Sequence, residues 1–183
     1  FNRDPEFVWT FYKERYYHLL TTKPNPAHYA LKKLKSNLRK NFHLITQNVN
    51  AQHERAGNKN LYGMHGPLTK CCCIGCHAQY NLSEIGLILP IPRCKVCDSI
   101  LRPDVVWFGE IPYFLYEIEQ QLKDCDYFYI IGTSGTVYPA AGFVMTAKLF
   151  GAHTVSVNLE RPDNLDFIDE FHKGNCSDLL PLI

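Results

Sequence analysis

The 183-residue chain carries 19 basic and 18 acidic side chains and is 46% hydrophobic, which is ordinary for a globular domain. Its formal net charge of +1 offers no broad positive surface for nucleic acid. No stretch approaches the roughly 18 continuous apolar residues of a membrane helix, so we expect neither nucleic acid nor a membrane as a partner.

Two helices are predicted at the start of the chain. Asp4-Pro5 and Asn25-Pro26 each place an N-capping side chain before a proline, and proline is favoured at the first helical position. Apolar residues then recur at helical spacing. We therefore expect one helix from Pro5 to about Thr21 and a second, amphipathic helix from Pro26 to about Leu38.

Strands and helices alternate in the rest of the chain. Strands are predicted at 42–46, 126–131 and 154–157, with helical segments at 114–123 and 140–150 between them. The strand at 126–131 is apolar enough that we expect it to be buried. The alternation predicts an α/β fold with a Rossmann-like parallel sheet, which binds ligands outside the carboxyl ends of its strands. The polar residues directly after each strand are therefore candidate binding residues.

The cysteines are clustered, since six of the eight lie within residues 71–97. Cys73, Cys76, Cys94 and Cys97 form two C-x2-C pairs separated by 17 residues, the spacing of two zinc knuckles. Four thiolates leave no open position for water, so we expect a structural zinc in a small zinc-ribbon module. A Cys72-x3-Cys76 pairing is a second register, and buried or disulfide-bonded cysteines are the alternative to a metal.

Several motifs occur in an order and spacing that resemble the sirtuin family. They are Thr46-Gln47-Asn48-Val49-Asn50 with His53, Met64-His65-Gly66 before the first zinc knuckle, Trp107-Phe108-Gly109-Glu110 after the second, and Gly132-Thr133-Ser134. The resemblance runs from about residue 4 to the C-terminus. An ordered set of motifs is a much stronger signal than any one of them alone.

The resemblance implies an NAD-dependent protein-lysine deacylase whose general base is His65, acting on a ribose hydroxyl of NAD. Its partners would be acyl-lysine proteins or peptides, and nicotinamide and O-acyl-ADP-ribose would be released. The implied NAD-binding residues are Gln47, Asn48, Val49, Asn50, Gly132, Thr133, Ser134, Asn158, Leu159, Glu160 and Cys176. The implied peptide-binding residues, which would pair with the substrate backbone as an added strand, are Val106, Trp107, Phe108, Gly109 and Glu110.

Tyr12 and Arg15 bear on the acyl group. They are three residues apart on the first predicted helix and so share one face, where a guanidinium fork beside a phenol suits a carboxylate. The pair resembles the Tyr-x-x-Arg of class III sirtuins of the sirtuin-five type, which prefer succinyl, malonyl or glutaryl lysine. The resemblance therefore implies selection of acidic acyl groups.

Two features depart from the family pattern. No glycine-rich phosphate loop occurs in the 183 residues, and the family's first strand is missing as well, so the expected sheet is incomplete. Asn50 stands where the family usually has aspartate, which bears on how nicotinamide is held. The chain begins at Phe1 without a targeting pattern, so we expect a fragment or a processed chain. A catalytically inactive truncated isoform or a zinc-ribbon protein-binding module is the alternative function.

Three segments are expected along the chain. Residues 1–66 would hold the helical segment and the start of the Rossmann-like domain, 67–104 the zinc-binding module, and 105–183 the rest of the NAD-binding domain. The resemblance implies a mitochondrial location, with cytosol or nucleus as the other possibilities.

Overall fold

A computed structural model of the chain describes residues 1, 3–86, 91–162 and 165–182. The chain forms two compact units, each built from separate stretches of sequence. Unit 1 contains Phe1–Lys23, Thr46–Gln52 and Gly63–Tyr113, and unit 2 contains Pro24–Ile45, His53–Tyr62 and Phe114–Ile183. The expected zinc module at 67–104 lies inside unit 1, and the expected boundaries at 66 and 104 stay a prediction. None of the helices in the described ranges could cross a membrane.

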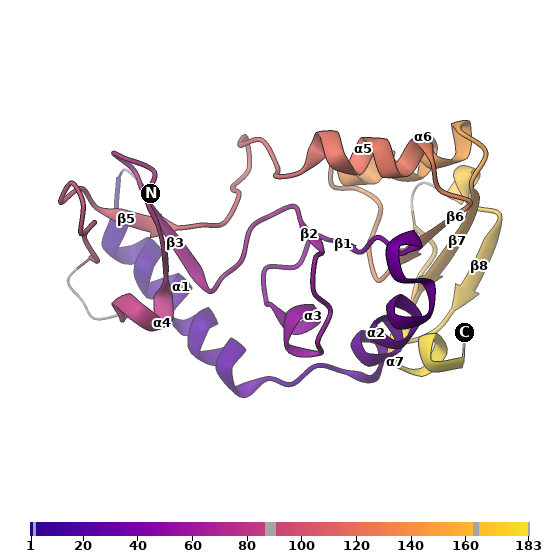
Figure 1. Ribbon diagram of the computed structural model, residues 1–183, viewed down its shortest axis with the longest axis horizontal. Helices are drawn as coiled ribbons and strands as arrows, with labels where there is room; N and C mark the ends of the chain where they lie inside the picture. The colour runs from indigo at the N-terminus through magenta and orange to yellow at the C-terminus, as the bar shows by residue number, and fades with distance from the viewer. Residues whose placement is uncertain (2, 87–90, 163–164, 183) are drawn as a thin grey trace. The chain divides into compact units, whose positions relative to one another are not determined.

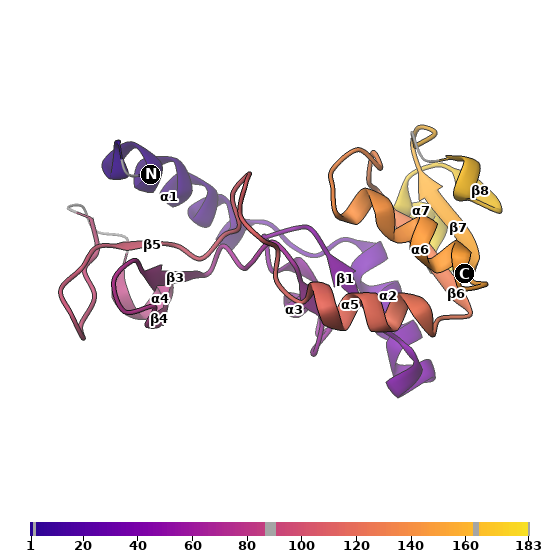
Figure 2. The same cartoon turned by 90° about the horizontal axis from the view of Figure 1, so that it is seen from above.

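Unit 1 opens with α1 (Pro5–Thr21), which confirms the first predicted helix. The Asp4 side chain accepts the backbone N–H of Phe7 over 2.9 Å and so caps the helix where the sequence suggested. Trp9 is only 2% exposed, and its indole Nε1 donates to the carbonyl oxygen of Leu101 over 2.9 Å. This bond joins α1 to a small sheet, beside which the helix lies in both Figure 1 and Figure 2.

The small sheet of unit 1 is antiparallel and has β3 (Lys70–Cys73) at its centre, between β4 (Gln79–Asn81) and β5 (Leu101–Pro103). A single helical turn, α4 (Leu82–Ile85), follows β4. These strands were not predicted, because they are short and lie among the cysteines. The buried residues packed around them are Trp9, Cys71, Cys73, Leu82, Cys94 and Leu101.

The strand predicted at 42–46 is shorter than expected, since β1 covers only Ile45–Thr46. Its partner β2 (Tyr62–Gly63) is equally short, so residues 42–44 have no longer strand against which to form a ladder. Within unit 1, the N–H of Met64 donates to the carbonyl of Thr46 over 3.0 Å. A short helix, α3 (Gln52–Arg55), lies between the two strands in sequence.

Unit 2 contains the second predicted helix as α2 (Pro26–Leu38), followed by a 3-10 turn, η1 (Arg39–Asn41). Asn25 and His28 form a reciprocal capping box at its start. The remaining helical elements of this unit are α5 (Leu115–Lys123), η2 (Ala140–Gly142), α6 (Phe143–Leu149), η3 (Leu165–Phe167), α7 (Cys176–Leu179) and η4 (Leu180–Leu182). The predictions at 114–123 and 140–150 are thus confirmed, the second as a 3-10 turn that continues into α6.

The sheet of unit 2 is parallel, in the order β6 (Tyr127–Ile131), β7 (His153–Asn158) and β8 (Glu170–Lys173). Helices α5 and α6 lie on one side of it and α2 and α7 on the other, as Figure 1 shows. This arrangement confirms the predicted α/β fold with a parallel sheet. One layer of its core consists of Ala27, Leu31, Leu44, Val157 and Leu180.

Residues 126–131 form a strand as expected, β6, but the expectation that this strand is buried is wrong. Tyr127 is 63% exposed and Tyr129 is 38% exposed, whereas Ile130 is 7% exposed. In the described sheet β6 is an edge strand with β7 as its one neighbour, and the two exposed tyrosines, two residues apart, share one face of it. Apolar composition alone does not distinguish an edge strand from a central one.

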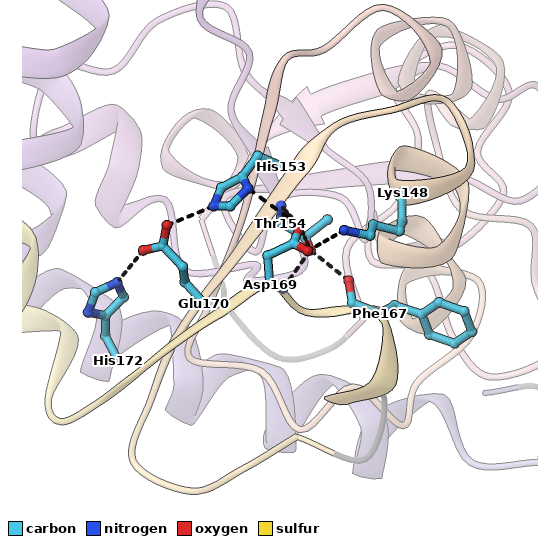
Figure 3. Close-up of polar contacts among 7 residues, drawn as sticks. All are labelled: Lys148, His153, Thr154, Phe167, Asp169, Glu170 and His172. Carbon is cyan, nitrogen blue, oxygen red and sulfur yellow. Dashed lines mark hydrogen bonds and ion pairs between the residues drawn. The ribbon is translucent and has the colours of Figure 1, made fainter.

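Strand β8 was missed because its sequence, Glu-Phe-His-Lys, is mostly charged or polar. A side-chain network at its start attaches it to β7 (Figure 3). The Asp169 carboxylate accepts the N–H of Thr154 over 2.9 Å and the hydroxyl of Thr154 over 3.0 Å, and it pairs with Lys148. The Lys148 ammonium, with these hydrogen bonds, holds the pKa of Asp169 well below its usual range. Polar anchoring of this kind leaves no apolar pattern in the sequence.

Candidate functional site

The four expected zinc ligands lie together in unit 1. The sulfur atoms of Cys73, Cys76, Cys94 and Cys97 are all within 4.8 Å of one another. The sulfurs of Cys73 and Cys97 are 3.4 Å apart, and those of Cys76 and Cys94 are 3.5 Å apart. A set of four thiolates in this arrangement fits tetrahedral zinc. Cys72 is not in the group, so the first register is confirmed.

The surroundings of the Cys73 and Cys94 sulfurs suit bound thiolates. Backbone N–H groups of Gly75 and Cys76 point at the Cys73 sulfur over 3.3 and 3.4 Å. The Tyr80 hydroxyl lies 3.1 Å from the Cys94 sulfur, and this hydrogen bond lowers the pKa of Cys94 to about 6. Hydrogen bonds that favour the charged sulfur also favour a metal, because a thiolate rather than a thiol is the ligand.

His65, the expected general base, lies in a turn directly after β2. Its Nδ1 is 3.0 Å from the backbone oxygen of Gln47. A carbonyl oxygen can only accept, so Nδ1 carries the proton and Nε2 keeps a free lone pair. The turn requires glycine at the next position, because Gly66 has φ +74° and an added Cβ would stand 2.1 Å from the Asp104 carbonyl oxygen. The local backbone therefore fixes the orientation of the imidazole.

The other predicted residues of this segment are held by short-range bonds. The Thr46 hydroxyl accepts the N–H of Asn48 over 3.1 Å, and the carbonyl of Val49 accepts the N–H of Leu68 over 2.8 Å. The side-chain oxygen of Asn50 accepts the N–H of Gln52 over 3.3 Å. The aspartate that the family usually has at this position could accept the same bond, so Asn50 preserves this turn. Hydrogen bonds thus bring residues 47–50 and His65 together within unit 1.

In the predicted peptide-binding segment, residues 106–110, Phe108 and Gly109 lie in a turn, and pairing with a peptide strand stays a prediction. The Val106 N–H already donates to the carbonyl oxygen of His65 over 3.0 Å, so it is not free to pair with a substrate backbone. Gly109 has φ +90° and lies in the turn closed by the N–H of Glu110 on the Trp107 carbonyl. The Phe108 side chain is 99% exposed, which leaves it available to an incoming ligand.

Tyr12 and Arg15 both lie on α1, and each side chain has a partner of its own. Trp107 donates its indole N–H to the Tyr12 hydroxyl over 2.7 Å. The Arg15 guanidinium lies over the Phe11 ring, 3.3 Å from its centroid, and pairs with no carboxylate among the residues that the structure describes. An exposed guanidinium that forms no ion pair within the described ranges is available for an anionic ligand.

A second set of predicted residues lies in unit 2, after the parallel strands. The Asn158 amide donates to the Thr133 carbonyl over 2.6 Å, and the N–H of Gly132 donates to the Val157 carbonyl over 3.1 Å. Gly132 has φ +62° and no atom within 4 Å of the place of a Cβ, so the loop has open space above it. The ends of β6 and β7 therefore form one edge of the sheet, as the Rossmann-like pattern predicted.

The remaining predicted NAD-binding residues also follow the strands of unit 2. Leu159 donates its N–H to the Asn158 side chain over 2.9 Å, and Leu159 is 63% exposed. Glu160 is exposed, and its carboxylate has no hydrogen bond or ion pair within the described ranges. Ser134 contacts the Thr136 hydroxyl over 2.8 Å. Cys176 is the first residue of α7 and is partly buried.

One residue with a clear structural role was not predicted, namely Arg102 on β5. Its guanidinium forms a two-pronged ion pair with Glu110 and lies over the Trp107 ring, 3.6 Å from the centroid. In the sequence Arg102 is an ordinary basic residue five positions after a zinc knuckle. Its proximity to the predicted substrate segment at 106–110 was the only signal that could have found it.

Comparisons with known proteins agree with this geometry. The family model described as "Sir2 family" matches residues 1–139. An NAD-dependent protein deacylase of Pasteurella multocida is 46% identical over 99% of this chain and 78% of its own length. The relative of the same name from Salmonella typhimurium is 46% identical over 99% of this chain and 67% of its own length.

Solved structures give the same result. The crystal structure of a Sir2 homologue–NAD complex has a TM-score of 0.93 and 33% identity, covering 100% of this chain and 72% of that one. A structure described as Sir2–p53 peptide–NAD+ has a TM-score of 0.82 and 29% identity, covering 88% of this chain and 69% of that one.

Proposed function

The chain belongs to the Sir2 family, and on that premise we propose that it is an NAD-dependent protein-lysine deacylase that removes acidic acyl groups. The acyl groups we have in mind are succinyl, malonyl and glutaryl, the preference of class III sirtuins. The carrying observation is the exposed Arg15 guanidinium, which forms no ion pair among the described residues and lies on the same helix as Tyr12, whose hydroxyl is held by Trp107. A phenol and a guanidinium on one helix provide directed donors for a carboxylate.

His65 would act as the general base. Its Nδ1–H is engaged by the Gln47 carbonyl, which leaves Nε2 as the basic nitrogen in the neutral ring. An imidazole held in one tautomer already has its basic nitrogen oriented for proton transfer. General-base catalysis typically increases the rate by a factor of about 10² to 10⁴. NAD, when bound, supplies the activated ribose to which the acyl group is transferred.

The residues around His65 would position the substrates and not react with them. Gln47, Asn48 and Asn50 follow β1 in a segment held by its own hydrogen bonds. Residues 132–134 and 158–160 would hold the adenosine side of NAD in unit 2, where Gly132 leaves open space and Glu160 offers a carboxylate to ribose hydroxyls. Zinc, held by the four cysteines, would stabilise unit 1 and take no part in the chemistry.

A peptide substrate is supported by one of the similar structures, which holds a p53 peptide together with NAD+. In the present chain the exposed Phe108 would contact such a peptide near the acyl-lysine entry. The mitochondrial location implied by the resemblance stays a prediction.

The proposal is tested by measuring kcat/KM with NAD for matched peptides that carry succinyl-, malonyl-, glutaryl- and acetyl-lysine. We expect the acidic acyl groups to be removed at least about tenfold more efficiently than acetyl, because one hydrogen-bonded ion pair contributes roughly 1.5 to 3 kcal/mol. Equal efficiency, or a preference for acetyl-lysine, would overturn the acidic-acyl part and leave the deacylase assignment.

A further inference from the structure

The loop that carries Trp107 is held by a bidentate ion pair between Arg102 and Glu110. Arg102 Nη1 donates to one carboxylate oxygen of Glu110 over 2.5 Å, and Nη2 donates to the other over 2.9 Å. Nη2 also donates to the Val105 carbonyl over 2.9 Å, and Nε donates to the Pro103 carbonyl over 3.3 Å. Every nitrogen of the guanidinium is thus bonded, which fixes the plane of the fork.

The same ion pair holds Trp107 at both its backbone and its ring. The Trp107 N–H donates to Glu110 Oε2 over 2.9 Å, while the indole ring lies on the Arg102 guanidinium at 3.6 Å from the centroid. The Arg102 side chain is 20% exposed, so this cation–π contact is partly shielded from water. Its partner carboxylate is favoured in the charged form, since Arg102 lowers the pKa of Glu110.

The orientation of Trp107 decides the hydrogen-bonding role of Tyr12. An indole N–H can only donate, so the Tyr12 oxygen accepts this 2.7 Å bond. The hydroxyl hydrogen of Tyr12 is then left to donate to another group. Among the residues that the structure describes, no acceptor takes it. A carboxylate, which only accepts, is the ligand group that matches such a donor best.

We propose that Arg102 is a positioning residue for recognition of the acyl carboxylate, because it orients Trp107 so that the Tyr12 hydroxyl serves as a donor toward the ligand. This inference rests on the proposed acidic-acyl preference and adds the residue that enforces it. Arg102 itself does not touch the substrate. It acts through Trp107, which lies 95 residues from Tyr12 in sequence.

The effect on ligands is measured by calorimetric titration of the chain with a succinyl-lysine peptide and with its acetyl-lysine counterpart. We expect Arg102→Met to weaken binding of the succinyl peptide about tenfold and to change binding of the acetyl peptide less than about twofold. The matched control is Arg93→Met, which removes the exposed Arg93–Asp98 ion pair of the same unit and should change neither affinity.

Coupling between the two residues gives a second readout. Tyr12→Phe should lower succinyl affinity to a similar extent, and adding Arg102→Met to it should cause no further loss, because Arg102 acts only by orienting the hydroxyl that Tyr12→Phe removes. Independent losses that multiply in the double variant would overturn the inference. So would an equal loss of succinyl and acetyl affinity in Arg102→Met.

The indole N–H resonances report the structural step directly. In a ¹⁵N–¹H spectrum the Trp107 resonance should move in both Arg102→Met and Tyr12→Phe, while that of Trp9, which bonds the Leu101 carbonyl, should stay as an internal check that unit 1 is folded. An unmoved Trp107 resonance in Arg102→Met would overturn the inference. If the wild-type chain itself binds both peptides equally, the acidic-acyl proposal fails. If the wild-type chain prefers the succinyl peptide and the Arg102→Met variant keeps the same preference, only the proposed role of Arg102 fails.

Discussion

The Nδ1 atom of His65 lies 3.0 Å from the backbone oxygen of Gln47. This bond links the predicted base to the predicted NAD-binding segment within one unit of the protein. It also selects the tautomer in which Nε2 is unprotonated, the form that can accept a proton. The catalytic hypothesis therefore depends on a single side-chain orientation that the backbone fixes.

His65→Asn should abolish most deacylation without unfolding the protein. We expect kcat to fall by about 10² or more, since general-base catalysis is lost, while the affinity for an acyl-lysine peptide stays within about twofold. Steady-state kinetics and peptide titration measure the two quantities. His18→Asn, which changes an exposed histidine in the last turn of α1, should leave both unchanged. A His65→Asn variant that retains wild-type kcat would remove His65 from the mechanism.

Zinc binding should depend on Cys73 and not on its neighbour. Cys73→Ser removes one of the four clustered sulfurs, so we expect loss of about one equivalent of zinc and melting of unit 1, whose core includes Cys73 and Cys94. Cys72→Ser is the matched control and should keep its zinc, because Cys72 lies outside the cluster. Metal analysis and circular dichroism give the two readouts. Loss of zinc in Cys72→Ser, with zinc retained in Cys73→Ser, would mean that the Cys72-x3-Cys76 register is used.

Arg15→Met should change acyl selectivity more than overall activity. The guanidinium rests on Phe11 and has no acidic partner among the described residues, so its removal should cost the succinyl peptide roughly tenfold to a hundredfold in kcat/KM. Deacetylation should change less than about threefold. The comparison uses both peptides with the same variant and with Lys13→Met, which alters a nearby residue of α1. Parallel loss of both activities in Arg15→Met would argue for a structural role.

A partly buried pair of histidines should make unit 2 sensitive to acid. The rings of His28 and His53 lie 4.6 Å apart between centroids, and the Nδ1 atom of His53 is buried without a hydrogen-bond partner. Burial, together with repulsion from His28, lowers the pKa of His53 to about 4. The folded state thus resists a proton that the unfolded state takes up near pH 6.5, so stability is present above pH 6.5 and is lost as pH falls toward 4.

After allowance for solvent screening at a partly exposed ring, the loss should be on the order of 1 to 2 kcal/mol across this window. Urea unfolding at several pH values measures it. His53→Gln should flatten the dependence, and His43→Asn, an exposed histidine of the same unit, should not. An unchanged slope in His53→Gln would assign the acid sensitivity to other groups.

The sequence predicted the elements whose signals are local. Asp4 and Asn25 cap their helices as expected, since an N-cap is formed by residues within one turn. The zinc ligands were also predicted, because knuckle spacing restricts which sulfurs can meet. Strand β8 (Glu170–Lys173) could not be predicted, because it pairs with β7 through Asp169 and Thr154, fifteen residues apart.

The candidate site was predictable only in part for the same reason. His65 and Gln47 were identified from motifs, but the bond between them depends on a turn at Gly66 that packs against Asp104. The network of Tyr12, Trp107 and Arg102 joins α1 to a loop far along the chain, and no local pattern indicates it. The burial of β6 was misjudged because it depends on what packs against each face of the strand, which an apolar run does not show.

Mass spectrometry of the products formed from NAD and a succinyl-lysine peptide tests the central claim most directly. The account predicts free lysine peptide, nicotinamide and O-succinyl-ADP-ribose in equal amounts, and none of the three above background with His65→Asn. Removal of the succinyl group without consumption of NAD, or equal product formation by the wild-type and His65→Asn proteins, would contradict it.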